Sequence, residues 1–189
     1  LDTGAGNDSI TVTGAVVLPG DMTFTTESIL EGAAGSLTAT NLILNNVGST
    51  GTSGSRLQTN ITDLQVTGAA TNVYVTDQDG LSIAAAKFSG AFDISTLAGN
   101  ITTSGNVIST GTSAFNVGNG GSIILSGAGN QFAGTPSFTS AGTINDLTIV
   151  SNSAVDLPTS TIGGDMTITA NGISQSGNVS VAGNSVFSA

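Results

Sequence analysis

The chain has 189 residues, of which 12 are acidic and 2 are basic, so its net charge is −10. This balance argues against nucleic acid and anionic membrane surfaces as partners, because both are bound through clustered Lys and Arg. The absence of Cys excludes disulfides. No run approaches the roughly 20 apolar residues of a membrane helix, so no membrane insertion is expected. Hydrophobic residues make up 38% of the chain, enough to bury a core.

In the first ten residues, Gly4, Gly6, Asp8 and Ile10 follow one another at a spacing of two. This spacing resembles the G-G-x-G-x-D-x-U-x repeat of calcium-binding β-rolls, with Thr in place of the first Gly. The resemblance implies a calcium site at Asp8 and Gly6. One repeat supplies about half of the six to eight oxygen ligands that calcium takes, so a neighbouring repeat would have to complete the site. The alternative is a tight Gly-Asn corner that leads into a strand.

Short β-type runs separated by Gly, Asn, Asp or Ser turns follow along the whole chain, and no helical pattern is sustained. The clearest predicted strands are residues 8–13, 21–26, 36–44, 61–67, 72–76, 81–84, 92–95, 122–125, 146–150, 165–169 and 179–181. Most alternate with a period of two, as Met166 and Ile168 do against Thr167 and Thr169. One face of each strand is therefore apolar, and the sequence predicts an all-β protein.

A repeat runs through the second half of the chain. Residues 101–107 return as residues 173–179, and Phe115 returns as Phe187, always at an offset of 72 (173 − 101 = 187 − 115 = 72). A constant offset predicts equivalent places in a regular stack. A shorter period is also present, because the strand starts at Ile83, Ile101, Ile123, Leu147 and Met166 have spacings of 18, 22, 24 and 19.

Those shorter spacings are typical of the coils of a β-solenoid, whereas the hairpins of a β-sandwich would turn about every 8 to 12 residues. We therefore expect a single parallel β-helix over residues 1–189, with about nine coils of roughly 20 residues. Gly-Asn and Asn-Gly pairs, such as Gly129-Asn130 and Gly177-Asn178, would form its corners. A meander of hairpins is the alternative, because Asn-Gly also favours hairpin turns.

Several motifs resemble filamentous-haemagglutinin-like giant secreted proteins. They are residues 55–60 (SRLQTN), 72–76 (NVYVT), 79–83 (DGLSI) and 99–102 (GNIT), and in the second half residues 128–132, 154–157 and 164–177. Arg56 stands where that family often has Pro. The resemblance implies a right-handed parallel β-helix that a Gram-negative bacterium exports as an adhesin, matrix protein or surface fibre. The family's secretion domain is not recognisable here, so the chain is expected to be an internal piece.

Catalysis has little support in the sequence. The chain has no His or Cys, and its only cations, Arg56 and Lys87, are far apart in sequence. The closest pair of carboxylates, Asp77 and Asp79, could serve a β-helix hydrolase or lyase, but an acidic turn over residues 77–80 is the simpler interpretation. We therefore expect no enzyme. Three further carboxylates, those of Asp21, Asp93 and Asp165, recur at the offset of 72 (93 − 21 = 165 − 93 = 72) and are predicted to occupy repeated corners.

The sequence thus predicts a structural segment of a large extracellular adhesin or surface fibre. Residues 47–56 would protrude as a loop. Copies of the chain or adjoining repeats would stack end to end, because neither end carries a cap against edge pairing. The alternatives are a calcium-binding module, or a module that binds host or bacterial surface glycans through Tyr74. The expected location is extracellular or on the cell surface.

Overall fold

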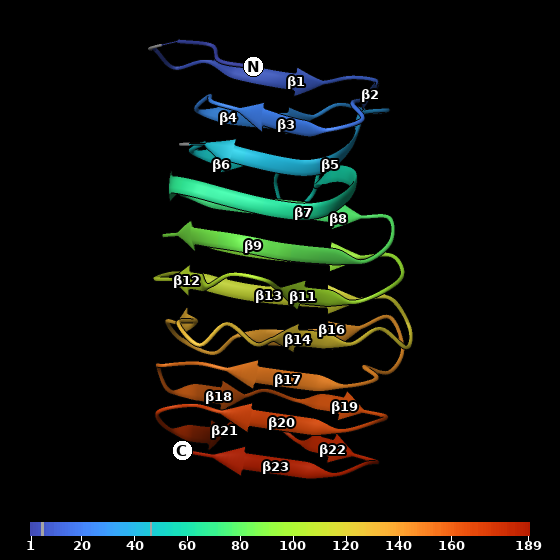
Figure 1. Cartoon of the computed structure of the whole chain (residues 1–189), viewed down its shortest axis with the longest axis vertical. Coiled ribbons are helices and arrows are strands. Elements are labelled where there is room, and N and C mark those ends of the chain that lie inside the picture. Colours follow the sequence, from blue (N-terminus) through green and yellow to red (C-terminus); the bar gives the residue numbers. More distant parts are fainter. Residues whose placement is uncertain (5, 46) are drawn as a thin grey trace.

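The computed structural model describes residues 1–4, 6–45 and 47–189. Within these ranges every regular element is a strand, and the strands wind in a right-handed coil from the N-terminus at the top of Figure 1 to the C-terminus at the bottom. The strands are β1 (Ser9–Val12), β2 (Ala15–Val17), β3 (Asp21–Phe24), β4 (Ser28–Glu31), β5 (Ser36–Asn45), β6 (Ser49–Thr50), β7 (Leu57–Ala70), β8 (Asn72–Asp77), β9 (Leu81–Phe88), β10 (Ala91–Thr96), β11 (Ile101–Thr103), β12 (Val107–Ser109), β13 (Thr112–Val117), β14 (Ile123–Leu125), β15 (Gln131–Phe132), β16 (Ser137–Ser140), β17 (Leu147–Val150), β18 (Val155–Leu157), β19 (Ser160–Ile162), β20 (Met166–Thr169), β21 (Ile173–Gln175), β22 (Val179–Val181) and β23 (Ser185–Ser188).

The named strands pair in parallel with strands of the adjacent coils. The column at the front of Figure 1 contains β3, β5, β7, β9, β11, β14, β17, β20 and β23. Register partners in this column differ in number by between 18 (88 − 70) and 24 (148 − 124). The bridge from Asp2 to Thr25 adds a first coil to the eight coils of this column. The prediction of a β-solenoid with about nine coils, each of roughly 20 residues, is confirmed.

The repeat at an offset of 72 does not mark equivalent places in the stack, as the sequence had suggested. Ile101 lies in β11, in the front column, whereas Ile173 lies in β21, which pairs with β18 in a separate two-stranded sheet. Phe115 is buried in β13, whereas Phe187 is exposed in β23. Three coils after Ile101 the front column reaches Met166 (166 − 101 = 65). An offset of 72 therefore leads past that position and onto another column.

Three of the four predicted spacings between strand starts are correct. Ile101, Ile123, Leu147 and Met166 are register partners in successive coils, at spacings of 22, 24 and 19. The partner of Ile101 in the preceding coil is Leu81, whereas the sequence had suggested the residue two positions later. Both side chains are buried on the same side of β9, and periodicity alone does not distinguish two inward residues that are two positions apart.

The core is one continuous column of apolar side chains inside the coils. Six of the seven Phe residues are buried in it. Phe115 contacts the rings of Phe92, Phe132 and Phe138 at centroid distances of 6.1, 6.1 and 6.0 Å, and Phe92 stacks on Phe88 at 4.4 Å. Because these rings come from three successive coils, the cluster joins coils along the axis.

The corners hold the coils in register. Asn130, fully buried, accepts a hydrogen bond from the Val107 N–H (2.7 Å) and donates to the carbonyls of Leu125 (3.1 Å) and Val150 (3.0 Å). At Gly105 a Cβ would overlap the Ala84 carbonyl of the coil before it, so only glycine permits this approach. The Gly-Asn pairs therefore serve as corners, as predicted.

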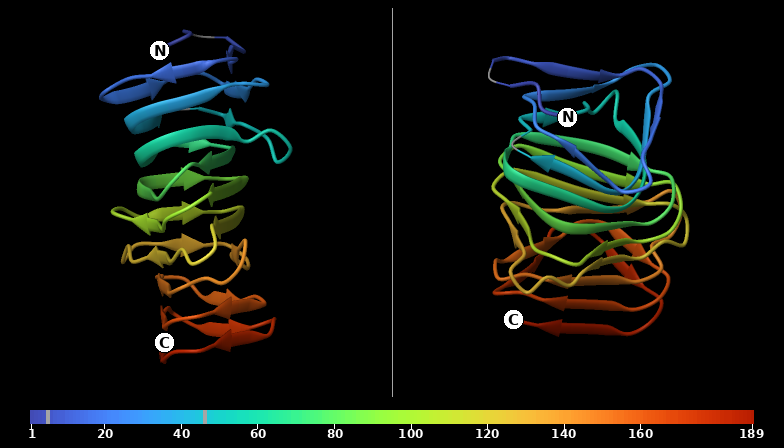
Figure 2. Two further views of the ribbon diagram at one scale, coloured as in Figure 1. Left: turned by 90° about the vertical axis from the view of Figure 1, so that its right-hand side faces the viewer. Right: turned by 45° about the horizontal axis from the view of Figure 1, so that its top comes forward.

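The predicted loop over residues 47–56 is shorter in the structure. Val47 and Thr50 are buried, and β6 pairs with β4 and β8 in the stack. Only residues 52–55 form a continuous exposed run in this segment, and they form the projection at the right of the left-hand view in Figure 2. We call residues 52–55 the arm. In the described ranges, no helix is long and apolar enough to cross a membrane.

Replacing Phe115 with Ala should lower the free energy of unfolding by about 3–5 kcal/mol, because it removes a fully buried ring that three others contact. The matched control is Phe187→Ala, which removes a ring that is 52% exposed and should cost about 1 kcal/mol or less. Urea denaturation followed by circular dichroism measures both. Equal losses in the two variants would contradict the assigned core.

Candidate functional site

The two calcium candidates lie on the turn that enters β1. Gly6 has a φ of +146°, and a Cβ there would come within 3.5 Å of Asp8 Oδ2. The N–H of Asp8 donates to Glu27 Oε2 at 2.9 Å. No group of three or more His, Cys, Asp or Glu side chains that could hold a metal occurs among the residues that the structure describes. The geometry thus resembles the corner alternative, and calcium binding at this turn stays a prediction.

The carboxylate pair Asp77 and Asp79 is separated by the end of β8. Asp77 is the last residue of that strand and is fully buried, so it belongs to a strand rather than to the predicted acidic turn, while Asp79 is exposed beyond it. Asp77 Oδ2 accepts hydrogen bonds from the Thr59 hydroxyl (2.6 Å) and the Ile61 N–H (3.0 Å). Its Oδ1 accepts the N–H of Asp79 (3.2 Å). A substrate cannot touch a carboxyl group enclosed in this way.

Burial raises the pKa of the Asp77 carboxyl to about 6. The three hydrogen bonds oppose this shift because they stabilise the ionised form, and the neighbouring Asp79 carboxyl raises the pKa further. In the next coil the register partner of Asp77 is Thr96, which is also buried. Thr59, Asp77 and Thr96 therefore form a polar column within the otherwise apolar interior.

An ion pair that the sequence did not predict fixes the base of the arm. Arg56 Nη1 lies 2.7 Å from Asp93 Oδ2. Its Nη2 donates to Asp93 Oδ1 (3.0 Å) and to the carbonyls of Asp93 (2.7 Å) and Val75 (2.9 Å), and its Nε donates to the Thr76 hydroxyl (2.9 Å). One guanidinium thus binds two further coils. Its planar set of donors suits this task better than a Lys ammonium would.

Two polar hollows lie along β7, and β5 also lines the second of them. One, of about 400 Å³, is lined by residues that include Glu31, residues 53–55 of the arm, Arg56 and Gln58. The other, of about 350 Å³, is lined by residues that include Thr38, Asn60 and Asp79. Burial raises the pKa of Glu31, and the hydrogen bond from the Gln58 N–H opposes that shift.

Tyr74, the predicted glycan contact, lines neither of these hollows. It is half-buried in β8 and pairs in register with Asp93. A role for Tyr74 in glycan binding therefore stays a prediction.

The recurring Asp21, Asp93 and Asp165 do not occupy equivalent corners. Asp93 lies within β10, whereas Asp21 begins β3 and Asp165 directly precedes β20. Each binds another coil: Asp21 Oδ1 accepts the Asn41 amide (2.6 Å), and Asp165 Oδ1 accepts the Asn184 N–H (2.7 Å). The prediction was wrong because it assumed that the offset of 72 corresponds to a whole number of coils.

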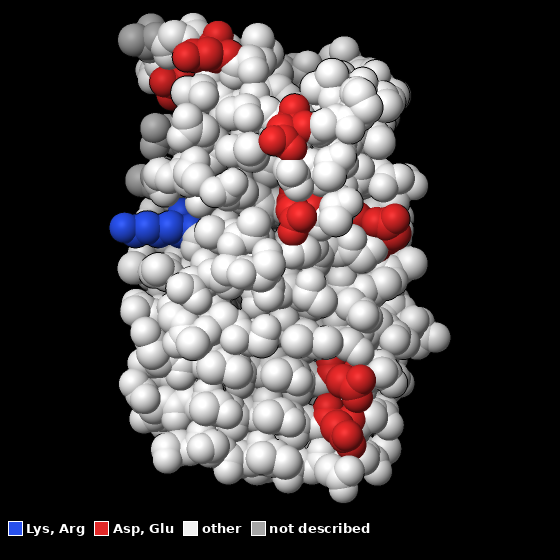
Figure 3. All heavy atoms as spheres, in the orientation of Figure 1, with Lys and Arg blue, Asp and Glu red and all other residues white. Residues whose placement is uncertain are grey.

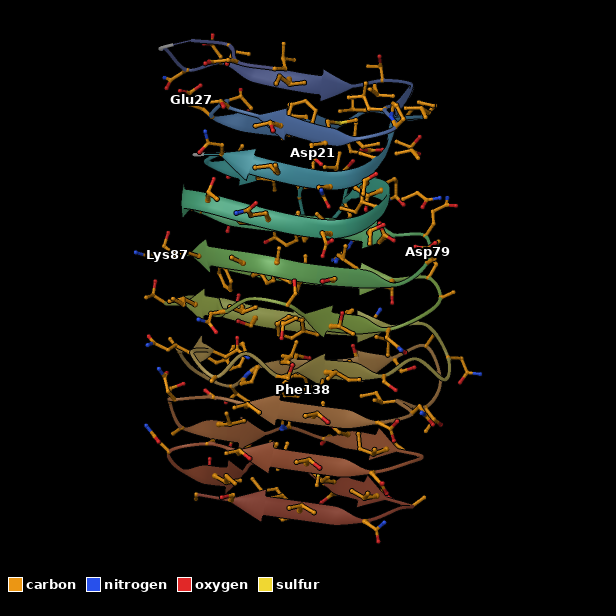
Figure 4. The ribbon with its side chains drawn as sticks, viewed as in Figure 1. Asp21, Glu27, Asp79, Lys87 and Phe138 are labelled. Atoms are coloured by element: carbon orange, nitrogen blue, oxygen red, sulfur yellow. The ribbon has the colours of Figure 1, made fainter. Side chains whose placement is uncertain are left out.

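Other carboxylates also bind neighbouring coils. Asp146 Oδ1 accepts the Asp165 N–H at 2.9 Å. Hydrogen bonds from the hydroxyls of Ser176 and Ser174 hold the pKa of Asp156 below its usual value, and the Thr135 hydroxyl donates to the same carboxylate. On the face in Figure 3 the acidic side chains stand in separate groups. Asp79 and Lys87 stand at opposite edges of that face (Figure 4).

Two segments of the chain, residues 70–139 and 144–189, match a family model described as repeats of unknown function (DUF5649). Together they cover more than half of the chain. Their starting points differ by 74 (144 − 70), close to the offset of 72 between the repeated motifs in the sequence. No curated protein and no solved structure matches the chain.

Asp77 should make the solenoid more stable in mild acid than at neutral pH. Its pKa of about 6 in the folded chain exceeds the ordinary value of 3.8, so between about pH 4 and pH 6 the folded chain holds a proton that the unfolded chain has lost. The free energy of unfolding should therefore fall as the pH rises through this window, by up to about 3 kcal/mol. Asp77→Asn should remove this fall and be more stable than the natural chain at pH 7.

Urea midpoints between pH 4 and pH 7 measure the effect. Asp156→Asn is the matched control, because the pKa of that carboxylate is lowered rather than raised and its removal should leave the fall in place. A fall of equal size in Asp77→Asn would assign it to other groups, such as Glu31, whose pKa is also raised.

Proposed function

The chain belongs to the DUF5649 family of repeats, and we propose that it is a structural segment of a large extracellular bacterial adhesin or surface fibre. The observation that carries the proposal is that charged side chains bind other coils of the stack. Asp21, Asp93, Asp146 and Asp165 each bind an adjacent or nearby coil. These carboxylates stabilise the stack instead of converging on a cleft, as an enzyme's acid and base would.

The geometry suits a spacer. Strands in a sheet are about 4.7–4.9 Å apart, so nine coils span about 43 Å along the axis. Each coil packs mainly on its neighbours, and the stability of such a stack is approximately additive along its length. Length can therefore change by whole coils while the cross-section stays constant. That the chain is not an enzyme remains a prediction.

The partners and the location are part of the same proposal. Adjoining repeats or further copies of the chain would continue the stack, and surface glycans of the host or of other bacteria would be contacted along it. The resemblance of residues 55–60, 72–76 and 79–83 to filamentous-haemagglutinin-like proteins supports a Gram-negative cell surface. The net charge of −10 favours repulsion from anionic membrane surfaces.

Solution scattering on one copy and on two fused copies of residues 1–189 tests the spacer role. The fused chain should form a rod about 43 Å longer with an unchanged cross-section, because the coil spacing is constant. Two compact bodies joined by a flexible region would contradict it.

Antibodies against the exposed arm test the location and should label intact cells of the source organism. Labelling only after lysis would overturn the extracellular assignment.

The calcium alternative is tested separately by calorimetric titration. Saturable calcium uptake that Asp8→Ala abolishes would favour a calcium-dependent module. A flat titration would leave the structural role. Asp21→Ala is the control, since Asp21 binds Asn41 in the next coil and lies away from the turn at Gly6 and Asp8.

A further inference from the structure

The two polar hollows follow each other along β7. Gln58 lines the hollow beside the arm, and Asn60 lines the hollow beside Asp79. Both alternate along the strand with the buried Leu57, Thr59 and Ile61, so their side chains share the outer face. We call the two hollows together the trough.

Small residues line both hollows of the trough. Gly35 lines the hollow beside the arm, and Ala39 and Gly80 line the hollow beside Asp79. A Cβ at Gly35 would overlap the Val12 carbonyl of the preceding coil. This position thus has no space for a side chain, because the backbones of two coils approach each other closely there.

The wall beside the arm is held in place before any ligand arrives. Thr52 and Ser55 exchange two backbone hydrogen bonds (2.9 and 3.2 Å), and the Ser55 hydroxyl donates to the Glu31 carbonyl (3.4 Å). Arg56 then fixes the base of the arm to Asp93. A site whose walls are already ordered loses less entropy on binding.

Several side chains of the trough have free hydrogen-bonding groups. With the part of the chain that the structure describes, the side chains of Thr38, Asn60 and Thr62 make no hydrogen bond. Elsewhere Asn amides bind neighbouring coils, as those of Asn41 and Asn130 do. Thr38 and Asn60 are register partners one coil apart, so they present a hydroxyl and an amide side by side.

The charges of the trough select the class of ligand. Glu31 and Asp79 place a carboxyl group at each end. Arg56, the cation that lines the trough, has its guanidinium engaged by Asp93 and Thr76. An anion would therefore meet repulsion without a free positive partner. Carboxylates, amides and hydroxyls together match hydroxyl groups that both donate and accept hydrogen bonds.

From these observations we infer that the trough binds a neutral oligosaccharide. The sugar lies along the outer face of β7, with Gln58 and Asn60 contacting its central units and Glu31 and Asp79 its two ends. Gln58 Nε2 donates to the Arg56 carbonyl at 2.9 Å, which orients its amide and leaves Oε1 as the group that accepts from the sugar. This binding site adds to the structural role and does not depend on it.

Titration of the full chain with cellopentaose, maltopentaose and N-acetylated chitopentaose tests the inference, followed by the amide resonances in NMR. At least one of these sugars should bind saturably and shift the side-chain amide signals of Gln58 and Asn60. Asn60→Ala should weaken binding at least tenfold, and Glu31→Gln should weaken it severalfold. The matched control is Asn152→Ala, an exposed Asn outside the trough, which should leave binding unchanged.

Three results would overturn the inference. They are the failure of all three sugars to bind, equal effects of Asn60→Ala and Asn152→Ala, and saturable binding of tetralysine in place of the sugars. Circular dichroism of each variant separates lost binding from lost folding. None of these results affects the spacer role, which the scattering and cell-labelling experiments test independently.

Discussion

Every coil of this solenoid must bring its backbone N–H and C=O groups opposite those of the coil before it, and the rest of the structure depends on this register. Parallel pairing fixes the coil spacing at about 4.7–4.9 Å. Each corner must therefore lie at about that distance from the corresponding corner of the next coil. Glycine at position 105 meets this requirement by having no Cβ. The buried Asn130 meets it by hydrogen bonding to three backbone groups. A corner that broke the register would leave backbone N–H and C=O groups unpaired in the interior, which costs free energy.

The same register constraint limits how charged side chains can be arranged along the stack. A parallel stack aligns like residues one above another, so charged side chains repeated in every coil would repel along the axis. The chain has only 12 acidic and 2 basic residues, and the carboxylates often accept N–H, amide or hydroxyl donors from the next coil. Asp77 follows this rule inside the core, where three donors surround it. Burial nevertheless raises its pKa, because the three donors do not fully replace the lost hydration.

The sequence predicted what depends on local pattern. Alternation in runs such as Met166–Thr169 identified the strands, and the spacing of Ile101, Ile123 and Leu147 identified the coils. The alternation in β8 also indicates that Asp77 is buried. Every second side chain of this strand points inward, and residue 77 is the third of these positions. A turn was predicted instead because the side chain of Asp77 is acidic.

Long-range features could not be predicted in the same way. Arg56 and Asp93 are 37 residues apart in sequence, and their contact depends on the exact length of each intervening coil. The error over the repeat at an offset of 72 has the same origin. A local pattern indicates that coils exist, whereas their register is the sum of all corner lengths, each of which varies by a few residues.

Variation in coil length also explains where surface features arise. Because the strands keep their register, extra residues in a longer coil have to leave the stack. The register partners Asn41 and Asp63 differ in number by 22 and enclose the arm, and Ile124 and Thr148 differ by 24 and enclose the exposed residues 133–135. The register constraint that makes the stack regular thus also places its irregular segments on the outside.

The trough lies beside one of these irregular segments, where the arm forms a wall and small residues line both hollows. The hollow beside Asp79 depends on the stack for its geometry, since register alone sets the outward side chains of β5 beside those of β7. The wall that the arm forms depends instead on the extra length of a single coil. A repeat protein of this kind can therefore vary its outer surface by changing the length of one coil while the core and the corners of the other coils remain as they are.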